Sequence, residues 1–226
     1  MLVRDLILSA RIVGIVMNFP LYDGNVSDKA RRFIADGKLD KALAEYRRLA
    51  ELGSGLAKCV LAYLNLRDLP HAPRNVEAAK ILANAALSSE PGYANYVLSY
   101  AAYFEKNAAK AIDLMCESHK AKFIPAASAL GLILGQGYGV SKHPKEAETF
   151  FLRAIVSGHI PAPMLLCRFY MRGDCGNAKR IVGLLLFPFS FLYVWISTRF
   201  LIFSIYTFRH FNVSVPPMFN EHALRA

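Results

Sequence analysis

Apolar side chains recur every three or four positions through most of this chain, the spacing expected of helices that bury one face. The clearest example is the stretch 126–162. It begins with Ala126, Leu130 and Gly131 on one helical face, where small residues allow a neighbouring helix to approach closely. Glycines at 135, 137 and 139 then break the helix and supply the backbone angles of a tight reversal. A second helical period follows from 145 to 157, so this stretch predicts a helical hairpin.

The second half of this hairpin recurs upstream. Ala147 is followed by apolar or small residues at offsets of three or four, seven and eleven, and the same template fits with its first alanine at Ala42, Ala79 and Ala111, except that Glu90 and Lys122 stand at the last offset of two copies. Successive copies therefore lie 37, 32 and 36 residues apart. Such a recurrence indicates stacked helical hairpins, each burying its apolar face on the next. The sequence predicts an all-α solenoid of about four hairpins over residues 26–178.

The order of these residues also matches a family pattern. A-x-x-x-L-G, then G-x-G-V, then A-x-x-F-F-x-x-A-x-x-x-G-x-x-x-A resembles the Sel-1-like repeat, a relative of the tetratricopeptide repeat. The chain departs from that pattern at Leu134, where the family usually has tyrosine, and it lacks the usual acidic residue after G-x-G-V. The resemblance covers roughly 27–176. The repeat positions it identifies are Ala126, Leu130, Gly131, Gly137, Gly139, Ala147, Phe151, Ala154 and Gly158.

Beyond residue 178 the repeat pattern gives way to an apolar segment. The run 181–198 holds 18 residues without a charge, which at 1.5 Å per residue spans roughly 27 Å, close to the hydrocarbon thickness of a bilayer. A soluble final helix of the array cannot hide so many apolar side chains on every side. We therefore expect a membrane segment over 179–210, as one transmembrane helix or a re-entrant hairpin. Its marker residues are Leu184, Pro188 as a kink, Trp195 at the interface, and Arg199, which must snorkel or face protein.

Flanking charge predicts the orientation of that segment. Four Lys and Arg residues precede it and two follow it, which favours a cytoplasmic repeat domain on a bacterial inner membrane. The N-terminal residues 1–25 are apolar or amphipathic, and three interpretations remain open: a helix packed on the repeats, a membrane-surface helix, or a cleaved signal. The tail 211–226 is expected to be flexible.

Composition narrows the function classes. The net charge of +10 is spread along the 226 residues without a basic run, which disfavours nucleic acid as a partner. The four cysteines are scattered and form no C-x-x-C pair. In cysteine-rich members of the family that the chain resembles, paired cysteines join neighbouring units near the positions of Ala154 and Ala162, so the resemblance implies no disulfide framework and a reducing compartment. We expect Cys59 and Cys116 to be core thiols.

No catalytic pattern emerges from the sequence. The six histidines show no metal-ligand spacing, and Glu146 and Glu148 lie two apart on a helix, on different faces. Neither G-x-S-x-G nor a phosphate-binding loop is present. We expect a protein that is not an enzyme, with no cofactor, no metal and no small-molecule substrate.

In the absence of a catalytic pattern, the candidate functional site is a binding surface. In a hairpin stack the first helices line an inner groove suited to proteins. The candidate partner-binding residues on these helices are Tyr63, Tyr96, Tyr100, Tyr103, Leu132 and Arg168. An alternative is that the tyrosines among them fill gaps between neighbouring units.

The resemblance implies an adaptor that assembles membrane or envelope complexes, in bacteria often for exopolysaccharide production or signalling. We therefore expect a membrane-anchored scaffold whose partners are another subunit of a membrane complex and the lipid bilayer. Two alternatives stay open. One is a secreted or periplasmic repeat protein that regulates a partner, and the other is a hydrolase that contains repeats.

Overall fold

The computed structural model describes residues 27–35, 38–67 and 73–203. The predicted N-terminal helix, the tail 211–226 and the last part of the membrane segment lie outside these ranges. The described residues are helical, without a strand among them. The helices are α2 (Asp28–Ala35), α3 (Leu39–Glu51), α4 (Gly55–Asn65), α5 (Val76–Asn84), α6 (Pro91–Phe104), α7 (Ala108–Lys120), α8 (Ile124–Gln136), α9 (Pro144–Val156), α10 (Ala162–Met171) and α11 (Asn177–Phe203).

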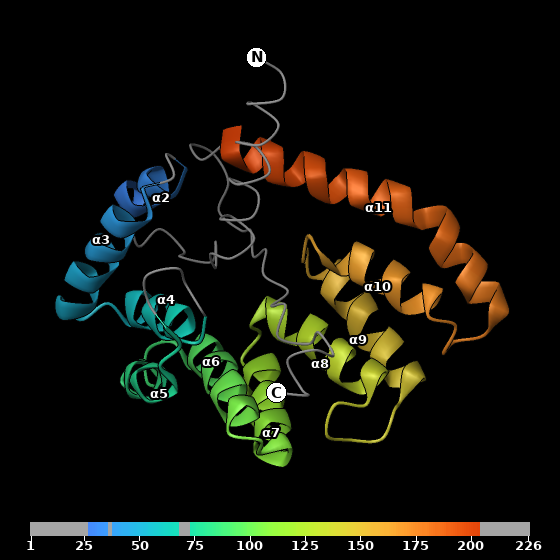
Figure 1. The fold of residues 1–226 in the computed structure, drawn as a ribbon, viewed down its shortest axis with the longest axis horizontal. Helices are drawn as coiled ribbons and strands as arrows, with labels where there is room; N and C mark the ends of the chain where they lie inside the picture. The colour runs from blue at the N-terminus through green and yellow to red at the C-terminus, as the bar shows by residue number, and fades with distance from the viewer. Residues whose placement is uncertain (1–26, 36–37, 68–72, 204–226) are drawn as a thin grey trace.

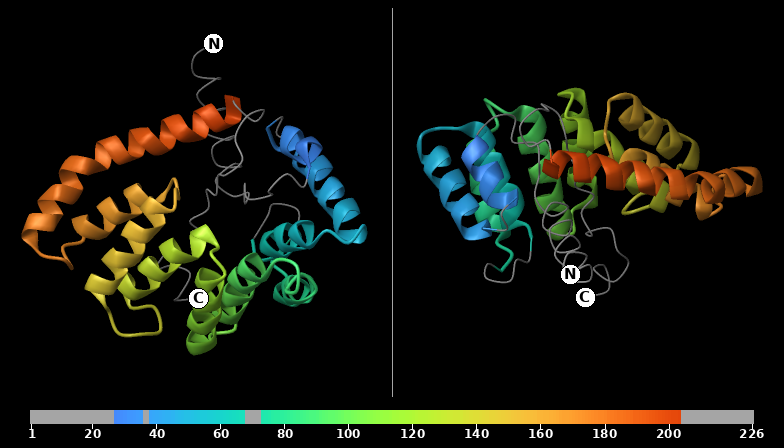
Figure 2. Two further views of the ribbon diagram at one scale, coloured as in Figure 1. Left: turned by 180° about the vertical axis from the view of Figure 1, so that it is seen from behind. Right: turned by 90° about the horizontal axis from the view of Figure 1, so that it is seen from above.

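These helices pair in chain order as α2/α3, α4/α5, α6/α7, α8/α9 and α10/α11, and successive pairs stack into an arc (Figure 1). Helices α4, α6 and α10 lie toward the inside of the arc, and their partners α5, α7 and α11 lie outside them. Helix α11 is the longest and leads back toward α2 at the opposite end, which is also visible from behind (Figure 2). The described chain is an all-α solenoid.

Alanines at matched positions hold the hairpins together. Each of these side chains is fully or almost fully buried where two helices meet, because a methyl group lets the backbones approach closely. Two of the second helices also begin in the same way, since Asn75 and Asn107 each accept a hydrogen bond from the backbone N–H three residues later. The matched alanines are Ala42, Ala79, Ala111 and Ala147 in the second helices and Ala57, Ala94, Ala126 and Ala162 in the first helices.

The turn after the second helix is repeated as well. Gly53, Lys122 and Gly158 stand eleven residues after their anchor alanines, and all three have a positive φ, of 94°, 61° and 80°. Each donates its N–H to the carbonyl three residues earlier. This left-handed conformation suits glycine and costs other residues roughly 1–2 kcal/mol. Lys122 therefore occupies a turn position whose left-handed backbone conformation favours glycine.

Helix α11 changes the expected end of the repeat domain. Gly183, 36 residues after Ala147, occupies the anchor position of a further second helix and is buried against α10. The predicted boundary at 178/179 falls in the first turn of this one continuous helix. Within the described residues the helices form five pairs, one more than the about four hairpins expected, because the apolar segment itself supplies the partner of α10.

Candidate interaction surfaces

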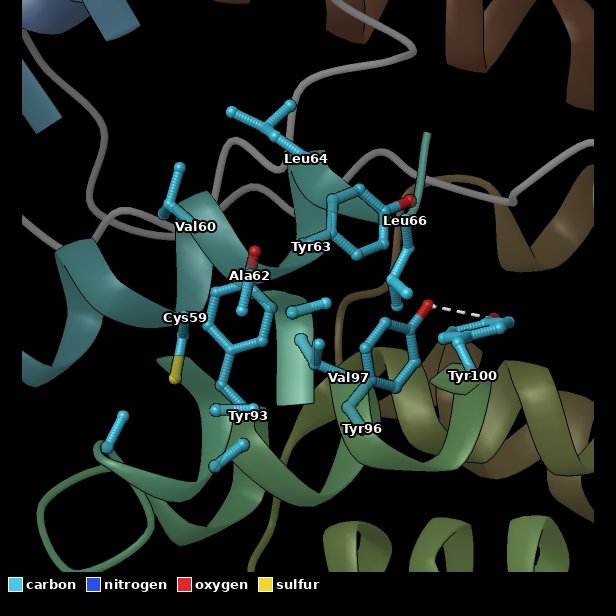
Figure 3. Close-up of a cluster of buried hydrophobic side chains, with 14 of the residues drawn as sticks. Cys59, Val60, Ala62, Tyr63, Leu64, Leu66, Tyr93, Tyr96, Val97 and Tyr100 are labelled. Atoms are coloured by element: carbon cyan, nitrogen blue, oxygen red, sulfur yellow. Dashed lines mark hydrogen bonds between the residues drawn. The ribbon is translucent and has the colours of Figure 1, made fainter. Parts of the chain in front are cut away.

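Three tyrosines expected to contact a partner are core residues instead. Tyr63, Tyr96 and Tyr100 are at most 2 % exposed. The rings of Tyr63 and Tyr96 stack at 6.4 Å, and the Tyr96 and Tyr100 hydroxyls are 3.2 Å apart (Figure 3). They fill the space between α4 and α6, which belong to neighbouring units. The prediction that these three residues line an open groove is wrong, because the face they share is covered by the next unit.

The other residues of the predicted groove differ in exposure. Tyr103 and Leu132 are half-buried and pack against the main core cluster. Arg168 is exposed on α10. A partner-binding role for these three residues stays a prediction.

The repeat positions named from the sequence lie where hairpins meet or turn. Ala126, Leu130 and Phe151 are buried, and a Cβ at Gly131 would lie 2.9 Å from the Phe151 ring, so that glycine is required by close approach. Gly137 ends α8 in the left-handed conformation. Of the remaining positions, Ala147 and Ala154 are buried, and Gly139 and Gly158 have positive φ.

Sequence reasoning missed a buried cation beside the tyrosines. Arg67 follows the end of α4 and is 7 % exposed. Its Nη2 donates a 2.7 Å hydrogen bond to the Tyr63 hydroxyl, and its guanidinium lies 4.9 Å from the centroid of that ring. Its Nε is buried without a hydrogen-bond partner in the described part of the chain. The signal available in the sequence was an arginine four positions after a tyrosine, just beyond the end of a largely apolar helix.

The two side chains that most resemble a catalytic pair are buried inside the fold. Ser128 Oγ lies 2.5 Å from His159 Nδ1, and both side chains are buried between two units. A serine and a histidine this close together occur in the active sites of hydrolases. Here both side chains are buried, so a substrate cannot contact them. Burial also raises the pKa of the Cys59 thiol to about 12, so it stays protonated as a core thiol. Across the described ranges, no three His, Cys, Asp or Glu side chains are grouped to hold a metal ion.

A polar contact fixes the start of α11 to the solenoid. Glu148 on α9 accepts a 2.5 Å hydrogen bond from the Tyr170 hydroxyl and another from Lys179 Nζ at the start of α11. Burial raises the pKa of the Glu148 carboxyl, but the hydrogen bonds from Lys179 and Tyr170 outweigh it, and the pKa lies below its usual value. The carboxylate is therefore ionised and ties α9, α10 and α11 together.

The rest of α11 has two unlike faces. Gly183, Ser190 and Val194 are buried along one stripe. The opposite face is apolar and open, with Leu184 and Leu185 among its exposed residues. Pro188 is exposed, and the side chains of Trp195 and Arg199 are not described. The exposed apolar side chains are Ile181, Val182, Leu184, Leu185, Leu186, Phe189, Phe191, Leu192, Tyr193 and Ile196, at 39–65 % exposure except Phe189, at 70 %.

Length and composition alone make α11 a candidate membrane span. Within the described ranges, Asn177–Val194 is the stretch that is long and apolar enough to cross a bilayer, with a mean hydropathy of 1.2. Core helices of soluble proteins meet the same criterion when they are mostly buried, whereas most of this stretch is exposed. The exposed face therefore distinguishes this helix from the core helix of a soluble protein.

An arc of helical hairpins with small residues at matched crossings defines a repeat solenoid. No protein-family model and no curated protein matches the sequence. Two solved structures share the architecture, each with a TM-score of 0.51: a Sel1 repeat protein from Oxalobacter formigenes at 15 % identity, and a protective antigen present in uropathogenic Escherichia coli strains at 20 %. The alignments cover 66 % and 79 % of this chain, and 64 % and 46 % of those proteins. The chain therefore has the Sel1-like repeat fold and spans less than two thirds of either relative.

Proposed function

We propose that this protein is a membrane-attached adaptor that is not an enzyme, whose repeat arc binds another protein while α11 embeds in a lipid bilayer. The observation that carries the proposal is the open apolar face of α11. Transfer of a large aliphatic or aromatic side chain out of water is favourable by about 1.5–3 kcal/mol when it is fully buried. A contiguous patch of this kind marks a contact with a membrane or another protein. Single exposed residues such as Leu52 and Val156 do not.

Lipid fits this face better than a protein groove does. At 3.6 residues per turn, the exposed apolar positions cover roughly 220° of the helix circumference, wider than a groove that receives one helix face. No charge interrupts the sequence from 181 to 198. Arg180 is exposed in the first turn of α11 and Arg172 is exposed at the end of α10, and anionic headgroups attract basic residues beside a membrane segment. A bacterial inner membrane with the repeats on the cytoplasmic side agrees with this charge distribution.

The partner is proposed from the fold. Sel1-like solenoids present their inner helices as an extended concave surface, which is a surface for proteins. The resemblance to adaptors of envelope complexes favours a subunit of a membrane complex, for example one that synthesises or exports exopolysaccharide. Co-purification of the full chain from mild detergent, followed by mass spectrometry, names that subunit.

Membrane attachment is tested on the full chain by fractionation and an alkaline wash. We expect the wild type to stay in the pellet and the triple variant Leu185→Glu, Phe189→Glu, Leu192→Glu to move to the supernatant, because each carboxylate must leave the hydrocarbon. The matched control adds the same three charges at exposed apolar residues elsewhere, as Leu52→Glu, Ile81→Glu, Val156→Glu, and should remain in the pellet. A wild-type chain released by the wash contradicts the proposal, as does a control that is released equally with the triple variant.

A further inference from the structure

Three arginines gather at the turn between α10 and α11. Arg168 and Arg172 stand four residues apart at the end of α10, so their side chains share one face of that helix. Arg180 returns to the same turn from the start of α11, because its Cδ lies 3.7 Å from the position that a Cβ on Gly173 would occupy. All three arginines are exposed. They form an accessible positive surface, the arginine patch.

The acidic residues of this region already have partners. Asp174 in the turn lies 3.5 Å from Lys142, and Glu148 on α9 accepts a hydrogen bond from Lys179. Neither pair includes an arginine of the patch, and none of the three arginines forms an ion pair within the described ranges. The charge of the patch is therefore not neutralised by these acidic groups.

The arginine patch adjoins the exposed apolar face of α11. Arg180 is the last charged residue before the uncharged run 181–198. Leu184 and Phe191 follow it by four and eleven residues, which places them on the same side of the helix, and both are more than half exposed. A molecule that covers this apolar face can therefore bring an anionic group to Arg180. A phospholipid combines acyl chains with a phosphate in this way.

We propose that Arg168, Arg172 and Arg180 bind the phosphate of an anionic phospholipid whose acyl chains contact α11. The proposal rests on the membrane attachment proposed above and adds the class of lipid that the chain selects. Guanidinium groups form paired hydrogen bonds with phosphate oxygens, which the ammonium group of a lysine does not. A zwitterionic phospholipid carries the same phosphate, but its own ammonium group is repelled by the three positive charges. The patch therefore favours anionic over zwitterionic lipids.

The test titrates the full chain in dodecyl maltoside micelles with dioctanoyl phosphatidylglycerol and follows the thermal unfolding midpoint, which rises when a ligand binds the folded state. We expect dioctanoyl phosphatidylcholine and inorganic phosphate to leave the midpoint nearly unchanged. The triple variant Arg168→Gln, Arg172→Gln, Arg180→Gln should bind phosphatidylglycerol about 100-fold more weakly, since each basic residue near an anionic surface contributes about fivefold. Because the three residues are exposed, its midpoint without lipid should equal that of the wild type.

Two matched variants separate a site from general attraction. The variant Lys106→Gln, Lys110→Gln, Lys122→Gln removes the same charge from exposed residues in and beside α7, across the arc from α11 (Figure 1), and should bind like the wild type. Lysine at all three patch positions keeps the charge but loses the paired hydrogen bonds, and should weaken binding about threefold. Equal binding by the lysine variant, or an equal loss in the α7 variant, overturns the proposal. An equal response of the wild type to phosphatidylcholine or to inorganic phosphate also overturns it.

The alkaline wash keeps this proposal separate from membrane attachment. A wild type that stays in the pellet but shows no midpoint rise with phosphatidylglycerol overturns the arginine site and leaves the attachment standing. A wild type that the wash releases contradicts the attachment, and the titration then decides alone whether the patch binds the lipid phosphate. Retention in the pellet together with a midpoint rise that the glutamine variant loses supports both.

Discussion

The contact at Gly183 tests whether α11 belongs to the repeat array. A Cβ at this position lies 2.8 Å from the Cys167 carbonyl oxygen and 2.8 Å from the Tyr170 Cβ, whereas relaxed contacts begin at about 3.5 Å. A backbone oxygen has no rotamer to change, so the two helices must separate by roughly 0.7 Å. Overpacking of this size costs about 3 kcal/mol. Alanine offsets about 1 kcal/mol through its helix propensity, and Gly183→Ala should loosen the last hairpin by about 2 kcal/mol.

The buried thiol of Cys167 reports on that loosening. In a chain where Cys59, Cys116 and Cys175 are replaced, a maleimide reaches the buried Cys167 thiol on α10 only through a local opening, and we expect a loosened α10/α11 hairpin to open more often. A change of about 2 kcal/mol predicts that Gly183→Ala speeds the labelling about 30-fold. A second chain that keeps only Cys59, buried in the α4 unit, is the control and should label at an unchanged rate. Equal labelling of Cys167 with and without the methyl group would refute the packing of α11 on α10.

Two further substitutions test the repeat geometry. Lys122→Gly should raise the free energy of unfolding by about 1 kcal/mol because it relieves a left-handed lysine, while Lys120→Gly, at the last residue of helix α7, should lower it. If both glycines destabilise alike, the turn is not strained. Tyr96→Ala should destabilise by about 3–5 kcal/mol in denaturant titrations, and Tyr96→Phe by about 1 kcal/mol, because the ring fills the α4/α6 junction and the hydroxyl is hydrogen-bonded. A stable Tyr96→Ala chain contradicts the burial of that ring.

The sequence predicted the hairpins because the residues that make them act locally. A small residue is required wherever two helices cross closely, so Ala42 and Ala147 can be recognised from spacing alone. A turn that needs a positive φ shows itself as glycine at Gly53 and Gly158. The matching turn at Lys122 carries no such mark, since its geometry is imposed by the flanking units.

Exposure could not be predicted in the same way. The spacing assigns Tyr96 to a helical face, but whether that face lies open depends on the distance to the next unit, which no local pattern encodes. The apolar composition of α11 hid its packing role for a related reason. Gly183 is one small residue among many apolar ones, so the membrane signal dominated the repeat signal. Arg67 was missed because a single arginine in the sequence does not predict its own burial.

The continuity of α11 sets a limit on how the molecule can be divided. A fragment that stops before Asn177 loses the Lys179 tie to Glu148 and leaves the α10 surface around Cys167 without its cover. Such a fragment would no longer carry the exposed apolar face of α11, but the uncovered surface of α10 would favour aggregation. A better soluble version keeps the helix through Val194 and replaces only its outward residues by polar ones.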